Sequence, residues 1–203
     1  MGQHGKHRPL VKTRIGAALA LMFAPASVWA APCRLALLLA LDVSSSVDAN
    51  EDLLQRGGLA AALRSPEVIQ AFFASDAQVA LGVYEWSGAA HQQVLLDWRM
   101  IDSPETLAKT ARQLEVSTRS AASLRTAMGH ALRFGATMFD TAPACDARTL
   151  DMAGDGQNNE SFGPQTAYQA PAFAGITVNG LAVNAADFEG EIGLLRFYRE
   201  KVL

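Results

Sequence analysis

The sequence has little cysteine, little basic charge and no long apolar run. Its 203 residues include two cysteines, and 17 lysines and arginines stand against 20 acidic residues. The apolar run near the N-terminus, residues 15–24, is much shorter than the ~20 residues that a membrane-spanning helix needs. Phosphate binding needs a basic surface, so the acidic excess argues against a nucleic-acid role. We therefore expect a protein with no nucleic-acid partner and no membrane span.

Three catalytic motifs are also missing. The sequence contains no Gly-x-Ser-x-Gly elbow of the kind serine hydrolases use, and no Gly-x-Gly-x-x-Gly turn follows the first expected strand. A phosphatase of the haloacid dehalogenase type would have a second aspartate two residues after Asp42 as its general acid, but that position is Ser44. These absences argue against an enzyme. A metal-dependent hydrolase that uses Asp42 and Asp155 stays as the less favoured alternative.

The first thirty residues have the organisation of a secretory signal peptide. An apolar run, residues 15–24, follows a basic stretch and precedes small residues up to Ala30; the basic residues are Lys6, Arg8, Lys12 and Arg14. Val28 and Ala30 occupy the small-residue positions before a cleavage site. We therefore predict a signal peptide at residues 1–30, cleavage after Ala30, and a periplasmic or secreted mature domain at residues 31–203.

The predicted mature chain suits one domain. Removing 30 of the 203 residues leaves 173, without an obvious linker or internal repeat. Four of the 17 basic residues leave with the signal, so 13 remain against 20 acidic residues, a formal charge of −7. Both cysteines, Cys33 and Cys145, stay in this domain, where an oxidising compartment favours pairing. Composition alone leaves two separate buried thiols as the alternative.

Apolar strands alternate with helical patterns along this domain, which predicts an α/β fold. Only four residues separate the second and third strands, too few for a parallel crossover, so the third strand must be antiparallel. The result is a doubly wound, mostly parallel sheet with one antiparallel edge strand and helices on both faces. Ligands in such sheets bind outside the carboxyl ends of the strands. The expected strands are 34–41, 78–86, 91–98, 149–153 and 176–183, and the expected helices are 48–63, 67–73, 103–114, 124–139 and 187–201.

Three oxygen-rich segments lie at that end of the predicted sheet. In the first, the alternating positions Asp42, Ser44 and Ser46 can converge, and their hard oxygen donors suit Mg²⁺ or Mn²⁺. The second contributes Thr126, near the start of a helix, and the third contributes Asp155, between two glycines. Each segment alone has an ordinary explanation, since Ser and Thr cap helices and an aspartate between glycines is common in turns.

Together the three segments resemble the von Willebrand factor A domain and its metal-ion-dependent adhesion site. In that family, the serines of an Asp-x-Ser-x-Ser motif coordinate the ion directly, a threonine adds a hydroxyl, and an aspartate after the fourth strand completes the site. The resemblance implies a metal set of Asp42, Ser44, Ser46, Thr126 and Asp155. It also implies Mg²⁺ or Mn²⁺ as the ion, a partner protein that offers a carboxylate to it, and no catalytic residue.

Two stretches, residues 84–88 and 154–159, look more narrowly like an uncharacterised bacterial subfamily of exported proteins with this domain. The chain departs from the wider family at Arg125, where a glycine is usual, and this supports a metal-free interaction domain as an alternative. The chain also has one helix after the 176–183 strand, where the family adds another strand and helix. We expect a shortened C-terminus that leaves this strand as an exposed edge.

The resemblance bears on the cysteines and histidines too. In the family's fold, the strands that follow Cys33 and Cys145 are neighbours, at a spacing that suits a disulfide. We therefore predict a Cys33–Cys145 bridge at the end of the sheet opposite the metal. His91 and His130 are isolated, and we do not expect either to bind metal.

Overall fold

The structure is a computed structural model that describes residues 1–2, 32–183 and 189–203. Apart from its first two residues, the predicted signal peptide and its cleavage site lie outside the described residues. Residues 31–203 form one compact unit. Within the described part of the chain, no helix is both long and apolar enough to span a membrane.

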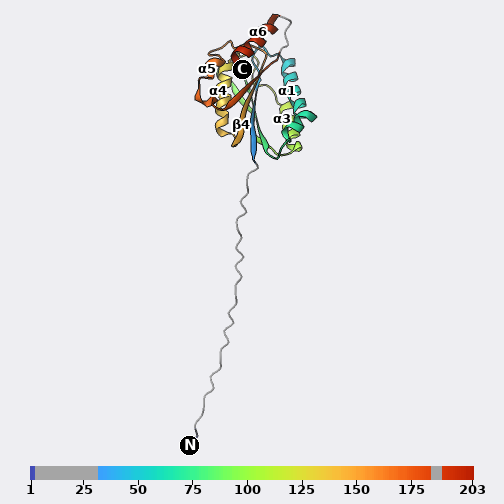
Figure 1. The fold of residues 1–203 in the computed structure, drawn as a ribbon. Helices are drawn as coiled ribbons and strands as arrows, with labels where there is room; N and C mark the ends of the chain where they lie inside the picture. The colour runs from blue at the N-terminus through green and yellow to red at the C-terminus, as the bar shows by residue number, and fades with distance from the viewer. Residues whose placement is uncertain (3–31, 184–188) are drawn as a thin grey trace. The chain divides into compact units, whose positions relative to one another are not determined.

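One sheet of five strands forms the middle of the domain (Figure 1). The central strand pairs in parallel with a strand on each side, and a parallel strand and an antiparallel strand form the two edges. This confirms the predicted mostly parallel sheet with an antiparallel edge. In spatial order the strands are β3 (Gln92–Ile101), β2 (Gln78–Trp86), β1 (Cys33–Asp42), β4 (Cys145–Gly154) and β5 (Ile176–Ala182).

Helices cover both faces of the sheet, as expected (Figure 1). On one face, α1 (Ala49–Leu63) packs beside α3 (Pro104–Glu115), with the short α2 (Pro66–Phe72) between them in sequence. On the other face lie α4 (Met128–Met138), α5 (Pro164–Ala167) and the C-terminal helix α6 (Glu189–Phe197).

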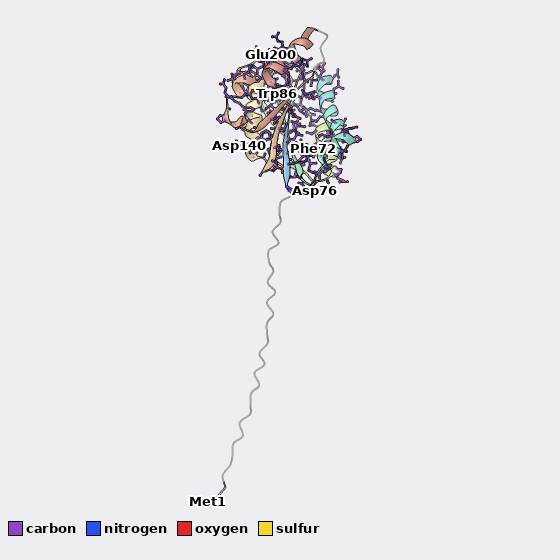
Figure 2. All side chains as sticks on the ribbon, viewed as in Figure 1. Met1, Phe72, Asp76, Trp86, Asp140 and Glu200 are labelled. Carbon is purple, nitrogen blue, oxygen red and sulfur yellow. A yellow bond between two sulfur atoms is a disulfide. The ribbon has the colours of Figure 1, made fainter. Side chains whose placement is uncertain are left out.

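The central strand β1 supplies apolar side chains to both cores. Leu38 and Ala40 belong to the cluster under α4 and α6, and Leu39 and Leu41 belong to the cluster under α1 and α3. A strand buried on both faces has a continuous apolar sequence, which is why residues 34–41 read as a strand without alternation. Trp86, at the end of β2, lies inside the body of the domain (Figure 2) and is fully buried.

Helix α4 begins four residues later than its sequence pattern predicts. The reason is tertiary hydrogen bonding. The Leu124 carbonyl accepts a hydrogen bond from the Ser45 amide (2.8 Å), and the Thr126 amide donates to the Asn159 side chain (2.9 Å). These partners hold residues 124–127 in an extended loop rather than in a first helical turn.

The predicted disulfide is present. Cys33 and Cys145 are directly opposite each other in the pairing of β1 with β4, with their Cα atoms 4.5 Å apart, and their sulfurs are bonded. The bridge joins the amino ends of two central parallel strands. It therefore lies at the opposite end of the sheet from Asp42 and Asp155.

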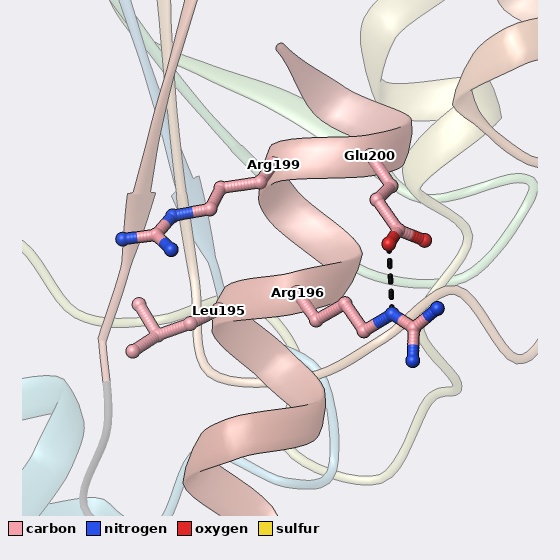
Figure 3. Close-up of a pocket in the computed structure, with 4 residues that line it drawn as sticks. All are labelled: Leu195, Arg196, Arg199 and Glu200. Carbon is pink, nitrogen blue, oxygen red and sulfur yellow. Dashed lines mark hydrogen bonds and ion pairs between the residues drawn. The ribbon is translucent and has the colours of Figure 1, made fainter.

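Helix α6 continues into one wider turn, η3 (Tyr198–Val202), which ends the chain against the sheet. Tyr198 and Val202 are buried in the core, while Arg196 and Glu200 form an exposed ion pair at 2.7 Å (Figure 3). An exposed pair of this kind contributes little to stability, because water screens it. The burial of the two apolar residues is what holds this helix on the sheet.

Candidate metal site

Strand β1 ends at Asp42, whose side chain is fully buried at the carboxyl end of the sheet. The Ser44 amide donates to Asp42 Oδ1 at 2.8 Å, while Asp42 Oδ2 has no hydrogen-bond partner within the described residues. Burial raises the pKa of this carboxyl to about 7, because removal from water penalises the charged form. The site therefore contains a buried oxygen with an unused lone pair.

Three hydroxyls and a second carboxylate form a connected row beside Asp42. The Thr126 hydroxyl donates to Ser44 Oγ at 3.2 Å, Ser44 Oγ lies 3.0 Å from Ser46 Oγ, and Ser46 donates to Asp155 Oδ1 at 2.6 Å. Ser44 and Thr126 are 82 residues apart in the chain, and Ser46 and Asp155 are 109 apart. The structure thus brings together the oxygens that the sequence placed on three separate loops.

Asp155 is only half-buried, and its environment differs from that of Asp42. Partial burial raises the pKa of Asp155, the hydrogen bond from Ser46 opposes that rise, and the nearby Glu51 carboxylate adds to it. Glu51 is held by the capping box of α1, where it accepts from the Asp48 amide at 2.6 Å. Negative charge is therefore concentrated at the carboxyl end of the sheet.

Thr126 does not cap α4, although a helix-capping role was the ordinary explanation for it. The residue before the helix is Ala127, which has no side-chain capping bond. Instead, the Asn159 side chain accepts from the Thr126 amide at 2.9 Å, and the Thr126 carbonyl accepts from the Asn159 amide at 2.9 Å. The loop after β4 therefore orients the Thr126 hydroxyl toward Ser44. Sequence reasoning assigned Asn159 no role.

A buried ion pair supports the same loops from the side of α1. Arg56 and Glu85 are both fully buried and lie 2.6 Å apart, and Arg56 also contacts Asp52 at 2.9 Å. The other Glu85 oxygen accepts from the Ser120 amide at 2.8 Å, and Arg56 donates to the Ser117 hydroxyl at 2.7 Å. This network fixes the start of the loop that leads to Thr126. Nothing in the sequence pattern marks it, because it depends on which helix packs over β2.

Two glycines let the backbone come close to these oxygens. A Cβ on Gly154 would lie 2.7 Å from the Tyr198 hydroxyl and 2.9 Å from Asp42 Oδ2, so any side chain there would displace one of them. A Cβ on Gly156 would lie 3.3 Å from Ser46 Oγ and 3.5 Å from Thr126 Oγ1. The Gly156 backbone thus borders the space that the two hydroxyls face.

The donor set fits a hard divalent cation. It consists only of oxygens, two carboxylates and three hydroxyls, which is the chemistry that Mg²⁺ and Mn²⁺ accept while keeping bound water. The unpartnered Asp42 Oδ2 is the kind of buried acceptor that such an ion or its water would satisfy. Within the described residues there is no cluster of three or more His, Cys, Asp or Glu, so the set differs from a carboxylate or imidazole cage.

His91 and His130 take no part in this cluster. His91 lies 2.7 Å from the Ser120 hydroxyl, and His130 lies 2.9 Å from the Ser161 hydroxyl and stacks near Phe162. Each ring has an ordinary hydrogen-bond partner.

Comparison with known proteins identifies the fold. No curated protein matches the sequence. One similar structure is that of proximal thread matrix protein 1 from the mussel byssus, with a zinc-occupied MIDAS (metal-ion-dependent adhesion site) motif. It superposes with a TM-score of 0.57 at 15% identity, over 82% of this chain and 42% of that one. BatB, a conserved hypothetical protein from Bacteroides thetaiotaomicron, gives a TM-score of 0.51 at 20% identity, over 73% and 66%.

These neighbours are von Willebrand factor A-domain proteins, and at such identities the likeness shows the fold alone. The chain spans less than half of the length of the mussel protein. The von Willebrand factor A-like fold predicted from the three loops is therefore confirmed. Residues 32–203 match the family described as "Protein of unknown function (DUF1194)", and because this match covers most of the chain, the protein belongs to that family.

Proposed function

We propose that the chain is an exported protein-binding module that depends on one divalent metal ion, Mg²⁺ or Mn²⁺, held by Asp42, Ser44, Ser46, Thr126 and Asp155. The observation that carries the proposal is the row of hydroxyls from Thr126 to Ser46, which ends on Asp155 and lies beside the unpartnered buried oxygen of Asp42. The zinc-occupied MIDAS motif of the mussel protein supports the same reading.

Each residue has a defined task in this proposal. The neutral hydroxyls of Ser44, Ser46 and Thr126 supply oxygens without cancelling the charge of the ion. Asp155 accepts from the Ser46 hydroxyl, Asp42 accepts from the Ser44 amide and so fixes the loop, and both carboxylates hold bound water. An ion held in this way keeps an open position and enough positive charge to attract a carboxylate from a partner protein. In this arrangement the hydroxyls and carboxylates all serve to hold the ion and its water, so we propose no catalytic activity.

Export is part of the same proposal. We infer a signal peptide at residues 1–30 and a mature domain from residue 31, which places the module in the periplasm or outside the cell. The Cys33–Cys145 disulfide supports this placement, because such bonds persist in oxidising compartments. Cell fractionation of the full-length chain tests it, since a cytoplasmic product with reduced cysteines would contradict export.

The experiment that tests the metal site is calorimetric titration of Mg²⁺ or Mn²⁺ into the exported chain. We expect saturable heat that is lost in Ser44→Ala. Ser45→Ala is the matched control, because Ser45 is in the same loop but exposed, outside the row of hydroxyls. Retained heat in the control with loss in Ser44→Ala supports the proposal, and no heat with the unmodified chain at millimolar metal defeats it.

A metal-free interaction domain of the same fold is the second candidate. The exposed cation of Arg125, adjacent to Thr126, favours it, because a fixed positive charge there offers a carboxylate partner an alternative to an ion. The metal titration separates the two, with Arg125→Gly as a second form of the chain in which to repeat it. Under the metal-dependent proposal this substitution leaves the metal titration intact, whereas a metal-free domain shows no titration in either form.

A further inference from the structure

The two edges of the sheet are protected differently. The edge strand β3 carries Asp97 and Arg99, and its pairing with β2 has two register irregularities, features that discourage pairing with a further strand. The other edge strand, β5, has the sequence Ile-Thr-Val-Asn-Gly-Leu-Ala, with no charge, no proline and an unbroken register against β4. Within the described residues β4 is its only strand partner, so its outer backbone groups are open to another strand.

An apolar groove of about 690 Å³ runs beside β5, between that strand and α1. Its apolar lining comes from β1, α1 and the end of β5, and two of its leucines are unusually exposed, Leu54 at 74% and Leu181 at 63%. A soluble domain rarely leaves an apolar hollow of this size next to an open edge unless something covers it. The groove residues that matter here are Leu39, Leu41, Leu54, Leu59, Leu181 and Val183.

The charged side chains that line the groove are all acidic. Of the described residues that line it, Glu51 and Asp151 are acidic and none is a lysine or an arginine. The Asp151 side chain accepts a hydrogen bond from Asn179 of β5 at 2.8 Å, and partial burial raises its pKa, which means that water solvates this carboxylate poorly. An occupant that brings a cation close to Asp151 would therefore gain more than a neutral one.

We propose that β5 and this groove bind an extended segment of a partner protein in which apolar and basic residues alternate. The segment pairs with the open edge of β5 as a sixth strand. Side chains at every second position of an added strand share one face with Thr177, Asn179 and Leu181 of β5. Those side chains fill the groove beside Leu54, and a lysine or arginine among them reaches across β5 toward Asp151.

A second copy of the chain fits this surface less well. Pairing two β5 edges would supply no basic residue, because β5 contains none. It would also bring the acidic residues Glu51 and Asp151 of the two copies toward each other. The charge of the groove therefore favours a basic partner over self-association.

This surface is separate from the proposed metal site. None of its lining residues belongs to the metal set, although both open at the same end of the sheet, since Leu41 and Ala153 precede Asp42 and Asp155 closely in sequence. Binding at the groove should therefore persist in chelator and in Ser44→Ala. A failed metal titration and a failed groove experiment are thus distinguishable results.

The test selects displayed random peptides of twelve residues on the purified chain in the presence of EDTA. We expect enriched sequences that alternate apolar residues with at least one lysine or arginine. The winning peptides, made synthetically, should bind about tenfold more weakly to Leu54→Asp and Leu181→Asp. Leu53→Asp is the matched control, because Leu53 is also on α1 and 68% exposed but does not line the groove. Asp151→Asn should weaken only the peptides that carry a basic residue.

Other outcomes overturn the proposal. Failure to enrich any sequence, enrichment without basic residues, or equal loss of binding in the Leu53 and Leu54 variants would each do so. Concentration-dependent dimers in sedimentation that Leu181→Asp abolishes would assign the groove to a second copy instead. The substituted leucines are mostly exposed, so circular dichroism should show that every variant is folded.

Discussion

The two ends of the central strand pair β1 and β4 are built by opposite means. At the amino ends, Cys33 and Cys145 join the strands covalently. At the carboxyl ends, Asp42 and Asp155 bring two carboxylates and their neighbouring hydroxyls into a buried or half-buried cluster, which raises the pKa of both acids. The first end stabilises the fold, and the second costs stability unless a cation is present. Under the proposed function, stability and binding therefore belong to opposite ends of the same strands.

Removing the disulfide should produce the largest loss of stability. The bridge closes a loop across 112 residues, so Cys33→Ser with Cys145→Ser should lower the free energy of unfolding by about 2–5 kcal/mol. Urea denaturation of the oxidised and double-serine forms measures this loss. Because the bridge is at the far end of the sheet, Mg²⁺ affinity should stay within about twofold. A collapse of metal affinity would show that the two ends are coupled.

Glu85→Gln should cause the next largest loss of stability. It sharpens the comparison because Glu85 lies near the proposed metal site but stabilises the fold instead of contacting the ion. Removing its charge leaves the buried Arg56 partly uncompensated, so we expect a loss of about 3 kcal/mol in the free energy of unfolding. The exposed pair of Arg64 and Glu115 is the control, and Glu115→Gln should lower the free energy of unfolding far less, because water screens that pair. Equal losses of unfolding free energy in the two variants would contradict a special stabilising role for the buried pair.

Asp42→Asn should stabilise the metal-free protein at alkaline pH. The folded-state pKa of Asp42, about 7, is above the unfolded value of 3.8, so the folded state holds the proton more tightly. The unmodified chain therefore carries a penalty above pH 7 that is relieved as the pH falls from 7 toward 4. In chelator, we expect Asp42→Asn to be more stable than the unmodified chain at pH 8, and this advantage to shrink on acidification. An advantage that does not vary with pH would contradict a raised folded-state pKa for the Asp42 carboxyl.

Gly156→Ala should change stability least and metal binding most selectively. Its new methyl group would face the Ser46 and Thr126 hydroxyls at 3.3 and 3.5 Å, in the space proposed for the ion. We expect a loss of metal affinity of at least about tenfold, with the free energy of unfolding changed by less than about 1 kcal/mol. Thermal denaturation in chelator beside a Mg²⁺ titration measures both. Unaltered affinity would place the ion elsewhere.

Most of the fold could be predicted from the sequence because its strands are apolar and its turns are short. The residue range expected for β2 matched in full, and the hairpin to β3 followed from the four residues between them. The first half of β4 could not be found. Its residues Asp146, Ala147 and Arg148 are exposed, and pairing with the neighbouring strands β1 and β5, rather than an apolar pattern, makes them a strand.

The candidate site was predictable only as far as its motif. Asp42, Ser44 and Thr126 belong to a recognisable pattern, and the structure brings their loops together. The roles of Asn159 and Arg56 were not predictable, because a polar residue is buried only when a distant segment supplies its partner. Local sequence carries no record of that partner.

Trp86 gives the domain a built-in optical probe. The Trp86 backbone carbonyl accepts a hydrogen bond from the Val43 amide at 2.9 Å, which connects this residue to the loop of Ser44 and Ser46. The ring is fully buried, so its emission should be shifted to short wavelength, and any rearrangement of that loop should alter its intensity. Trp98 on β3 emits as well, so in a Trp98→Phe variant the fluorescence of the mature domain can follow events at this end of the sheet in real time, without a label.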